Sequence, residues 1–505
     1  MLKPTVYLVG AGPGDTKLIT IKGLELIKRA DCIIYDYLVN SELLKFRKDD
    51  CKLIYVGKKA GAHTLIQDKI NRLLVREAKA HRSVVRLKGG DPFIFGRGAE
   101  EALCLNKQRI NFEVIPGVTS AIAVAAYAGI PLTERSKNST VGFITGHEDP
   151  GKLDSNIDWQ ALVKALGTMV FLMGVGNLDL IVKKLVACGK PKDTPVALIR
   201  WGTTARQKTV IGTLSNIVEI SRKNKLSPPA IIVVGETVAL RKELNWFEKK
   251  PLFAKRIIVT RTREQASLLS EKLRESGAEV MEIPVIEVVS QKADKQLKNA
   301  FLSDKYGWIF FTSSNGVCEF GEFLKRTGRD SRIFGESKIC AIGTETAKSL
   351  QAIGIKPDYI PKQFVAEAIV KHFKNMGPKA AALACALILR AKKARDILPE
   401  GLRKVGFRVK IIDLYNTILP EEGALALKQA FKEQVDFVTF TSSSTVENFI
   451  KLLGGDYRKK LSGVKLASIG PVTSSTLKKF GLKANVEAKV YTIVGLVKAM
   501  VEKYD

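Results

Sequence analysis

The chain has 505 residues, of which 46% are hydrophobic and 26% are charged. This length is too great for one hydrophobic core and predicts two or more domains, while the composition is that of an ordinary soluble protein. The 81 Lys and Arg residues against 51 Asp and Glu give a net charge of +30. Such an excess favours an anionic partner, either nucleic acid or a polycarboxylate or phosphate ligand, although a Lys-rich solvated surface would produce the same count.

The sequence lacks the signals of membrane insertion, export and disulfide bonding. No stretch approaches the roughly 18 to 20 consecutive apolar residues of a membrane span, and the N-terminus lacks the basic-then-apolar order of a signal peptide. We therefore expect a cytoplasmic protein without a membrane partner. The seven cysteines are scattered without a C-x-x-C pair and are expected to be reduced thiols. None of the four histidines falls in a metal-ligand spacing, so we expect no metal site.

Short β-branched runs alternate with amphipathic stretches through the first half of the chain. The runs include "TVYLVG", "CIIYD", "KLIYVG", "SVVRLKGGD", "TVGFITG" and "AIIVVG". A strand followed by a helix, repeated many times, predicts an α/β fold.

Four glycine-bearing loops each follow a predicted strand in this first half. They are "GAGPGD", "LKGGDPFIFGRG", "IPGVTSA" and "FLMGVG", and loops at strand ends are where open α/β folds bind ligands. The first loop does not fit a dinucleotide, because its third glycine position holds Asp15 and Pro13 interrupts the helix entry. Asp36, which would be the ribose ligand of a dinucleotide site, is then available for another role.

The pattern changes at "LNWFEKKPLFAKRIIVTR", where a helical stretch ends and a new strand begins at Ile257, so we place a domain boundary near residue 248. The second half repeats itself: "WIFFTSSNGVCEF" is similar to "FVTFTSSSTVENF", and "ICAIGTETAKSLQAIGIK" is similar to "LASIGPVTSSTLKKFGLK". A nearly fixed offset between the copies predicts a duplicated α/β unit. We expect two similar lobes with the chemistry in a cleft between them.

The order of the glycine loops resembles the tetrapyrrole methylase superfamily, whose members bind S-adenosylmethionine without a Rossmann fingerprint. Within it, "YDYLV", "VGKKAGAH", "RLKGGDPFIFGRGAEE" and "IPGVTSAIAVAAYAGIPLTER" resemble the uroporphyrinogen-III C-methyltransferase family over residues 3 to 245. The resemblance implies a two-subdomain methylase fold over residues 1–248, with S-adenosyl-L-methionine as methyl donor. It implies a cofactor pocket lined by Pro13, Gly89, Gly90, Asp91, Ile94, Thr119, Ser120, Met173 and Gly202.

The same resemblance implies roles for residues outside the cofactor loops. Asp36 becomes a proton acceptor, because methylation of a pyrrole carbon leaves a proton to be lost, and Lys58 becomes its acid partner. Arg135 is implied as a substrate ligand, and the sequence departs from the family next to it, where Glu134 stands in place of the usual His. The sulfonium already carries an activated methyl, so the protein chiefly aligns a pyrrole carbon with it.

The second half, residues 249–505, resembles the uroporphyrinogen-III synthase family. The resemblance implies lobe one from residues 255–286 plus 418–505 and lobe two from 289–411, joined by the passes "IPVIEV" and "IIDLYNT". Tyr415 resembles the tyrosine that the family points into its cleft, and is the implied catalytic residue. The implied substrate ligands are Arg261, Thr312, Ser313, Ser314, Thr441, Ser442 and Ser443. For the threonines and serines, a structural role as helix N-caps is at least as consistent with the sequence.

Together the two resemblances imply a bifunctional enzyme of tetrapyrrole biosynthesis. It would close hydroxymethylbilane to uroporphyrinogen III with inversion of the last ring, and methylate that product twice to precorrin-2, for siroheme or cobalamin. Both substrates are octa-carboxylates, which rationalises part of the net charge of +30. The alternative is an RNA-modifying methyltransferase with an inactive accessory domain, but the sequence carries no RNA-binding signature, so we expect no nucleic-acid partner. The resemblance also implies a homodimer formed through the methyltransferase half.

Overall fold

The computed structural model describes residues 4–57, 67–147, 156–260, 263–375 and 385–503. Helices alternate with strands throughout, which confirms the predicted α/β class. The chain divides into two compact units, one of residues 1–256 with the short segments 271–280 and 501–505, the other of residues 257–270 and 281–500. Among the described residues, none of the helices has both the length and the apolar character to cross a bilayer.

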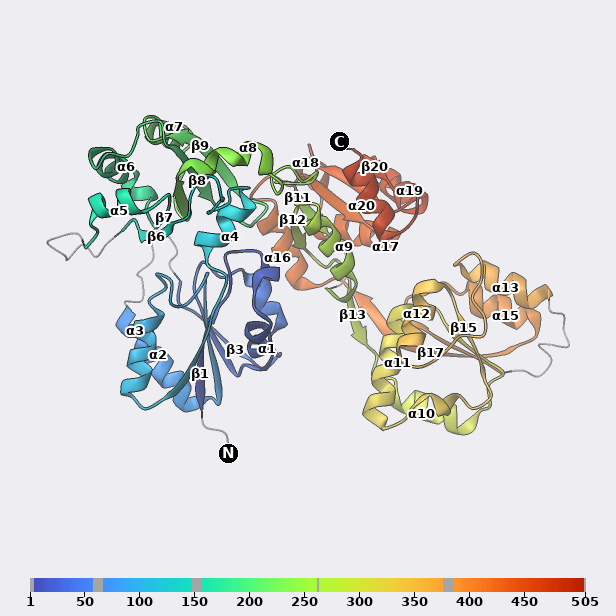
Figure 1. Cartoon of the computed structure of the whole chain (residues 1–505). Coiled ribbons are helices and arrows are strands. Elements are labelled where there is room, and N and C mark those ends of the chain that lie inside the picture. Colours follow the sequence, from blue (N-terminus) through green and yellow to red (C-terminus); the bar gives the residue numbers. More distant parts are fainter. Residues whose placement is uncertain (1–3, 58–66, 148–155, 261–262, 376–384, 504–505) are drawn as a thin grey trace. The chain divides into compact units, whose positions relative to one another are not determined.

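The first unit begins with a parallel sheet, sheet one, in the order β3-β2-β4-β1-β5. Helices α1 and η2 pack on one face of this sheet, and α2 and α3 pack on the other (Figure 1). Because both faces are covered, most strand positions are apolar. The bounds are β1 Thr5–Gly10, η1 Thr16–Leu18, α1 Ile21–Arg29, β2 Cys32–Tyr35, η2 Ser41–Phe46, β3 Lys52–Tyr55, α2 Gln67–Ala80, β4 Ser83–Lys88, α3 Gly98–Lys107 and β5 Asn111–Ile115.

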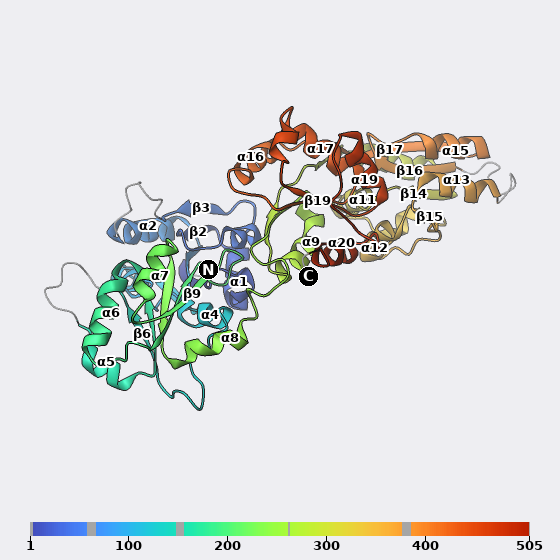
Figure 2. The same ribbon diagram turned by 90° about the horizontal axis from the view of Figure 1, so that it is seen from above.

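A second, mixed sheet follows in the same unit, in the order β6-β7-β10-β8-β9. Strand β10 is antiparallel to both β7 and β8, so β7 and β8 run in the same direction. Helix α4 packs on one face of this sheet, while α5 and α6 pack on the other (Figure 2). The bounds are α4 Ser120–Tyr127, β6 Val141–Thr145, α5 Trp159–Ala165, β7 Thr168–Leu172, η3 Val175–Asn177, α6 Leu178–Ala187, β8 Pro195–Arg200, β9 Lys208–Thr213, α7 Ile217–Lys223, β10 Ala230–Val234, η4 Glu236–Leu240 and α8 Arg241–Leu244.

The segment after α8 packs on the first unit beyond the predicted boundary at residue 248. The ring centroid of Phe247 lies 4.8 Å from that of Tyr127 in α4 and 5.5 Å from that of Phe253. Leu252 is fully buried. These apolar contacts explain why the main segment of the first unit extends to Arg256.

The second half contains two further sheets, one in each lobe. Lobe one has the order β12-β11-β18-β19-β20, and lobe two the order β13-β17-β16-β14-β15. The bounds in lobe one are β11 Arg256–Val259, α9 Arg263–Glu275, β12 Glu279–Glu282, α16 Glu421–Ala430, β18 Phe437–Phe440, α17 Ser443–Leu453, α18 Tyr457–Lys460, β19 Lys465–Ser468, α19 Pro471–Lys479, β20 Val486–Glu487 and α20 Ile493–Val501. The bounds in lobe two are β13 Glu287–Ser290, α10 Asp294–Ser303, β14 Trp308–Phe311, α11 Ser314–Thr327, η5 Ser331–Phe334, β15 Lys338–Ala341, α12 Thr344–Ala352, α13 Ala366–Asn375, β16 Cys385–Ala391, α15 Ile397–Val405 and β17 Arg408–Ile418.

The two passes between the lobes form a ribbon in lobe two. Strands β13 and β17 pair antiparallel, with Glu287 opposite Ile418 and Ser290 opposite Tyr415. Strand β17 therefore runs to Ile418, past residue 411 where the sequence placed the end of the second lobe. Strand β17 pairs with β16 from Arg408 to Tyr415 and with β13 from Tyr415 to Ile418. The two pairings together account for its length.

The lobes repeat one strand and helix pattern, as the sequence predicts. Strands β14 and β18 are each followed by a helix that a serine caps, Ser313 for α11 and Ser442 for α17. In both cases the serine hydroxyl accepts a hydrogen bond from the third backbone amide of the helix. Glycines Gly343 and Gly470 precede the next helix in each lobe, in extended conformations.

Candidate active sites

Three loops of the first unit meet at the carboxyl edge of sheet one. They follow β1, β4 and β5. The backbone N–H of Gly12 donates to the carbonyl of Gly90 at 3.2 Å, and the N–H of Gly90 donates to the carbonyl of Gly12 at 2.8 Å. The first two loops are therefore joined beyond the ends of their strands.

Glycine allows these backbones to approach one another. A Cβ built on Gly10 would lie 2.5 Å from Cα of Gly117 and 2.7 Å from the carbonyl oxygen of Gly90, closer than any side chain tolerates. A Cβ on Gly90 would lie 3.8 Å from the backbone nitrogen of Ser120 and 3.9 Å from Cα of Thr119. These backbone contacts bring the three loops together, and we call Gly10, Gly90, Gly117, Thr119 and Ser120 the glycine cradle. Four predicted cofactor residues, Gly89, Gly90, Thr119 and Ser120, belong to these loops.

The carboxylate of Asp91, another predicted cofactor residue, binds backbone amides. One oxygen accepts from the N–H groups of Phe93 at 2.8 Å and Ile94 at 3.1 Å, and the other accepts from the N–H of Gly117 at 2.9 Å. Asp91 therefore ties the loop after β4 to the loop after β5. Its side chain supports the wall of the glycine cradle, and Ile94 is held in the same turn.

The loop after β1 also contacts elements of the mixed sheet. The N–H of Asp15 donates to the Thr203 hydroxyl at 3.0 Å, and the phenol of Tyr127 donates to the Asp15 carboxylate at 2.8 Å. A Cβ on Gly14 would lie 2.8 Å from Cγ2 of Thr204. The loop that contains Pro13 therefore packs against α4 and against the loop after β8.

The structure places Met173 and Gly202 at one edge of the mixed sheet. Leu172 pairs with Ile231 and Arg200 pairs with Ala230, so the loops after β7 and β8 flank the start of β10. Gly202 backs onto α4, where a Cβ would lie 2.5 Å from a methyl of Val124. Met173 is 53% exposed.

Left-handed backbone is concentrated in these loops. Nine described residues other than glycine have positive φ, and the loops after β4, β7 and β8 contain five of them: Phe95, Arg97, Met173, Trp201 and Thr203. Left-handed backbone costs an L residue about 1–2 kcal/mol, and a β-branched residue tolerates it least, so Thr203 at +66° is the most strained. Strain of this kind persists mainly at functional sites.

Asp36 lies at the end of β2, on the same edge of sheet one. One carboxylate oxygen accepts from the N–H of Leu38 at 3.1 Å, and the other lies 3.5 Å from Nη2 of Arg86. The side chain is 25% exposed. The next residue, Tyr37, contacts the ring of Trp201 edge-on at 6.0 Å between centroids, so Asp36 lies close to the strained loop after β8.

The other two predicted residues of this half lie elsewhere. Lys58 falls outside the described residues, so its pairing with Asp36 stays a prediction. Arg135 is exposed on the turn that follows Pro131. Its neighbour Glu134 accepts hydrogen bonds from the hydroxyl of Ser136 at 2.5 Å and from its N–H at 3.1 Å, and these bonds lower the pKa of Glu134. Glu134, which departs from the family pattern, therefore stabilises the turn in which it lies.

Sequence reasoning missed a buried charged cluster beside Asp36. Arg86 and Lys88 of β4 each contact Oε1 of Glu101 in α3 at 3.0 Å. The side chains of Arg86, Lys88 and Glu101 are 4%, 5% and 0% exposed. The signal was present in "SVVRLK", because charged residues at alternate positions are unusual in a central parallel strand.

Exposed apolar side chains gather on the same loops. Their exposed fractions are 50% for Tyr37, 50% for Leu38, 52% for Phe93, 38% for Ile94, 42% for Phe95 and 53% for Met173. Large apolar residues that stay exposed on several neighbouring loops indicate a binding surface for an apolar ligand face. We call this set the apolar rim.

A second polar cluster lies at the opposite edge of sheet one, around Glu77. Donor atoms of Cys32, Glu77 and His81 lie within 4.8 Å of one another. The Glu77 carboxylate already pairs with Lys52 at 2.8 Å and Arg76 at 2.9 Å. Burial raises the pKa of the Cys32 thiol to about 12, so it is protonated at neutral pH. These contacts make the cluster a structural ion pair.

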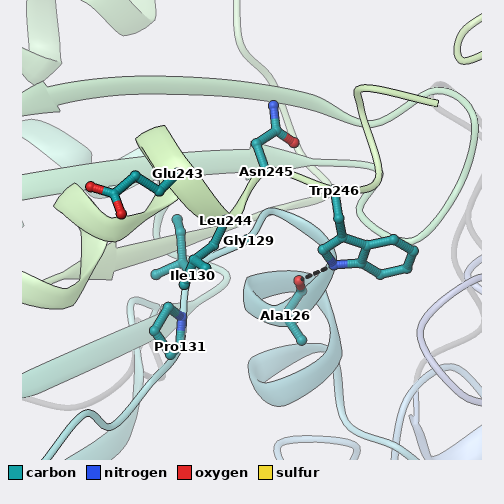
Figure 3. A pocket seen from close by; sticks show the side chains of 8 residues that line it. All are labelled: Ala126, Gly129, Ile130, Pro131, Glu243, Leu244, Asn245 and Trp246. Atoms are coloured by element: carbon teal, nitrogen blue, oxygen red, sulfur yellow. Dashed lines mark hydrogen bonds between the residues drawn. The ribbon is translucent and has the colours of Figure 1, made fainter. Parts of the chain in front are cut away.

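A shallow hollow of about 540 Å³ lies between the end of α4 and α8. Figure 3 shows the indole of Trp246 at one side of this hollow, with its N–H donating to the carbonyl of Ala126 at 3.0 Å. Gly129 is in contact with the backbone of Leu244. Apart from Glu243 and Asn245, the residues that line it carry no polar side-chain group other than the indole N–H, so we assign the hollow to packing of the segment after α8.

In lobe two, Tyr415 meets one of the predicted serine loops. Its phenol lies 2.8 Å from the hydroxyl of Ser313, and its side chain is only 5% exposed. Burial raises the pKa of Tyr415, and the hydrogen bond to Ser313 opposes this shift. The Thr312 hydroxyl donates to the carbonyl of Leu389 at 3.3 Å. Ser314 begins α11 directly after the Ser313 cap.

The matching residues of lobe one make local contacts. Ser442 caps α17 and forms a capping box with Thr445. The Ser443 hydroxyl accepts from Thr476 at 2.7 Å, and Thr441 directly precedes the cap. Arg261 falls outside the described residues. Both serine loops thus have the structural capping role that the sequence left open, and only the loop of lobe two also contacts Tyr415 within the described residues.

We expect Tyr415→Phe to slow ring closure about 2-fold to 13-fold, which is the value of one hydrogen bond of about 0.5–1.5 kcal/mol. The ratio of ring-inverted to non-inverted product should fall, because the substrate is held less firmly. The isomer ratio after oxidation measures this in a chain whose methyl transfer is disabled. Tyr306→Phe is the matched control, since it removes a phenol that bonds Asp304 in the same lobe and is also 5% exposed. An unchanged rate and ratio for Tyr415→Phe would reduce Tyr415 to core packing.

Two family models match the chain, one in each half. The model described as Tetrapyrrole (Corrin/Porphyrin) Methylases matches residues 5–218, and the model described as Uroporphyrinogen-III synthase HemD matches residues 267–498. A protein of Ruminiclostridium josui named Porphyrin biosynthesis protein HemD is 38% identical over 501 residues, which span 98% of this chain and 97% of that protein. The chain belongs to the fused uroporphyrinogen-III C-methyltransferase and synthase family.

Within this fused family, the methyltransferase half has relatives that stand alone. A protein of Methanosarcina barkeri named S-adenosyl-L-methionine-dependent uroporphyrinogen III methyltransferase is 52% identical over 235 residues, which span 46% of this chain and 92% of that protein. A solved structure of uroporphyrin-III C-methyl transferase from Thermus thermophilus, complexed with S-adenosyl homocysteine, is 38% identical and covers 47% of this chain and 99% of that one, with a TM-score of 0.41.

Proposed function

We propose that the chain converts hydroxymethylbilane to uroporphyrinogen III and then methylates this product twice, to precorrin-2. Membership of the fused family supports the pairing of the two activities. The observation that carries the methyltransferase proposal is the carboxyl edge of sheet one. There the glycine cradle, the apolar rim and the oriented carboxylate of Asp36 come together.

The glycine cradle fits S-adenosyl-L-methionine, the methyl donor that the name of the Methanosarcina barkeri relative carries. A Cβ at Gly10 or Gly117 would collide with the backbone of the neighbouring loops, so only glycine lets the three loops pack together as one backbone wall. Gly89, Gly90, Thr119 and Ser120 would hold the cofactor from the loops of sheet one, with Pro13, Ile94, Met173 and Gly202 around it and Asp91 holding the loops. When bound, the cofactor supplies an activated methyl on a sulfonium.

The substrate would lie with a pyrrole face on the apolar rim and its carboxylates toward solvent. Asp36 is the proposed proton acceptor: its carboxylate takes the proton that the methylated pyrrole carbon loses. Lys58 is the proposed acid partner and Arg135 a proposed carboxylate ligand. The net charge of +30 favours an anionic substrate of this kind.

In the second half, we propose that Tyr415 and the loop of Thr312, Ser313 and Ser314 contact hydroxymethylbilane. The buried phenol bonded to Ser313 supports this assignment. Thr441, Ser442, Ser443 and Arg261 are the proposed ligands from lobe one. The chemistry of ring closure is largely intrinsic to the substrate, so the protein's task is to hold the chain in the reactive conformation.

Incubation of the full chain with hydroxymethylbilane and S-adenosylmethionine tests both halves. We expect the absorbance of precorrin-2 to appear, and methyl label to enter supplied uroporphyrinogen III but not RNA. Label in RNA alone would support the alternative of an RNA methyltransferase. Product from uroporphyrinogen III but not from hydroxymethylbilane would remove the synthase half of the proposal.

We propose that each half is an independent domain, and expect residues 1–256 to methylate supplied uroporphyrinogen III when expressed alone. In the part of the chain that the structure describes, the hydrophobic cores either lie between Val6 and Val238 or lie between Ile258 and Ala484. The fragment ends at Arg256 rather than at residue 248 because Phe253 packs on Phe247, whose ring contacts Tyr127 of α4. Methyl incorporation by the fragment is the measurement. A folded but inactive fragment would contradict the independence of the domains.

We also propose that the chain acts in the cytoplasm as a homodimer formed through its methyltransferase half. Cys32, Cys51, Cys340 and Cys385 are buried thiols, which suits a reducing compartment. Light scattering on the full chain and on residues 1–256 tests the dimer, since both should have twice the monomer mass. A dimeric full chain with a monomeric fragment would move the interface to the synthase half.

A further inference from the structure

Arg86 is the one side chain of the described cluster that connects the buried charges to Asp36. Its Nε donates to Glu101 at 3.0 Å, and its Nη1 donates to the carbonyls of Leu87 at 3.1 Å and Ile34 at 3.4 Å. Its Nη2 lies 3.5 Å from the Asp36 carboxylate. Because a guanidinium is planar and rigid, the first three contacts fix the direction in which Nη2 points.

Burying the charges of Arg86, Lys88 and Glu101 costs free energy, which partners must offset. Taking charges out of water costs several kcal/mol for each ion unless partners compensate. Here two cations share one carboxylate oxygen of Glu101, whose other oxygen has no hydrogen-bond partner among the described residues. Glu101 alone therefore balances only one of the two cations, and Asp36 supplies the second negative charge.

Lys88 is part of the same buried cluster, but the contact with Asp36 is made by Arg86 and not by Lys88. Its ammonium donates to Glu101 at 3.0 Å, and that is its one side-chain hydrogen bond within the described part of the chain. Burial, reinforced by the nearby Arg86, lowers the pKa of Lys88. Lys88 thus shares the burial and the Glu101 contact of Arg86, so it is a matched control for a structural role.

We propose that Arg86 is a positioning residue for methyl transfer: anchored by Glu101 and by the backbone of β2 and β4, its guanidinium fixes the orientation of the Asp36 carboxylate. This inference rests on the proposed role of Asp36. Oδ1 accepts from the N–H of Leu38 at 3.1 Å and Oδ2 lies 3.5 Å from Nη2 of Arg86, so these two contacts restrict rotation of the carboxylate. Preorganisation of a base in this way contributes to rate and not to cofactor affinity.

A double-mutant cycle in the full chain tests the proposal. We expect Arg86→Met to lower kcat for methylation of uroporphyrinogen III about tenfold or more, the loss that corresponds to a hydrogen bond with a charged group. The KM for S-adenosylmethionine should stay within about twofold. In an Asp36→Asn background, Arg86→Met should change the residual rate less than about twofold, because the group it positions is gone.

The control variant Lys88→Met should lower the melting temperature as Arg86→Met does, but reduce kcat less than about threefold, since it leaves Asp36 held. If Arg86→Met does not fold, Arg86→Lys replaces it in the cycle. A lysine keeps a cation against Glu101 but lacks the fork that reaches two carboxylates. Arg86→Lys should therefore lower kcat in the chain that keeps Asp36, but not in the Asp36→Asn chain.

Two results would overturn the inference: equal losses of kcat in Arg86→Met and Lys88→Met, or a further loss when the Arg86 change is added to Asp36→Asn. Either would make the cluster a structural support. Failure of the proposed function is distinguishable, because Asp36→Asn alone would then methylate at the wild-type rate whatever the Arg86 variants do.

Discussion

Asp36→Asn should lower methyl transfer about 100-fold or more, the contribution expected of a positioned general base. The amide is nearly isosteric with the carboxylate and keeps one oxygen to accept the N–H of Leu38. It cannot take up the proton that the methylated pyrrole carbon must lose. The fold and the affinity for S-adenosylhomocysteine should therefore stay as in the wild type. Methyl incorporation into uroporphyrinogen III and calorimetric titration with S-adenosylhomocysteine measure the two effects.

Asp50→Asn is the control for this prediction, because it is the same chemical change in the same domain at a side chain that is 79% exposed. It should leave both rate and affinity unchanged. An Asp36→Asn chain that keeps more than about a tenth of the wild-type rate would show that the carboxylate has a structural role, with Leu38 and Arg86 as its partners.

Much of the fold could be predicted from the sequence, because the relevant signals are local. Apolar runs that alternate with amphipathic stretches define the strands and helices, and the repeat within the second half defines two lobes. Strand β17 runs on to Ile418, past residue 411 where the sequence placed the end of lobe two. The length of β17 depends on its pairing with β13 and β16, which are distant in sequence and leave no local mark.

The glycine motifs indicate which loops form the proposed cofactor site, but the contacts between these loops could not be predicted. Gly10 and Gly117 are far apart in the sequence and come within contact distance only because β1 and β5 are neighbours in sheet one. The family resemblance implies Asp91 as a cofactor residue, but it could not show that the Asp91 carboxylate accepts hydrogen bonds from three backbone amides. Arg86 was overlooked because its importance depends on Glu101 and Asp36, which belong to other elements.

The serine and threonine loops of the synthase half show a different limit of sequence reasoning. A serine after a strand caps the next helix whether or not it also binds a ligand, so Ser313 and Ser442 have the same local signal. Only the structure distinguishes them, because Ser313 also contacts the buried phenol of Tyr415. This contact makes lobe two the better supported part of the proposed synthase site.

The second large effect is expected at Gly117. A Cβ there would lie 2.7 Å from Cα of Gly10 and closer still to the carbonyl oxygen of Gly90, and all these atoms are backbone. Gly117→Ala should therefore force the loops after β1, β4 and β5 apart. Overpacking of this kind costs about 1–3 kcal/mol, which corresponds to a loss of about 5-fold to 150-fold in affinity for S-adenosylhomocysteine. Calorimetric titration of the full chain measures this loss.

The fused chain contains its own control for Gly117→Ala, because ring closure depends on the other half and should keep its wild-type rate. Gly455→Ala is a second control: its Cβ would meet nothing within 4 Å, so both activities should be unchanged. Wild-type affinity in Gly117→Ala would show that the cofactor binds outside the glycine cradle. The two large predictions thus separate the parts of the site, since Asp36→Asn should lose rate with binding intact, whereas Gly117→Ala should lose binding first. If both variants lost binding alike, Asp36 would belong to the cradle wall and another group would have to accept the proton.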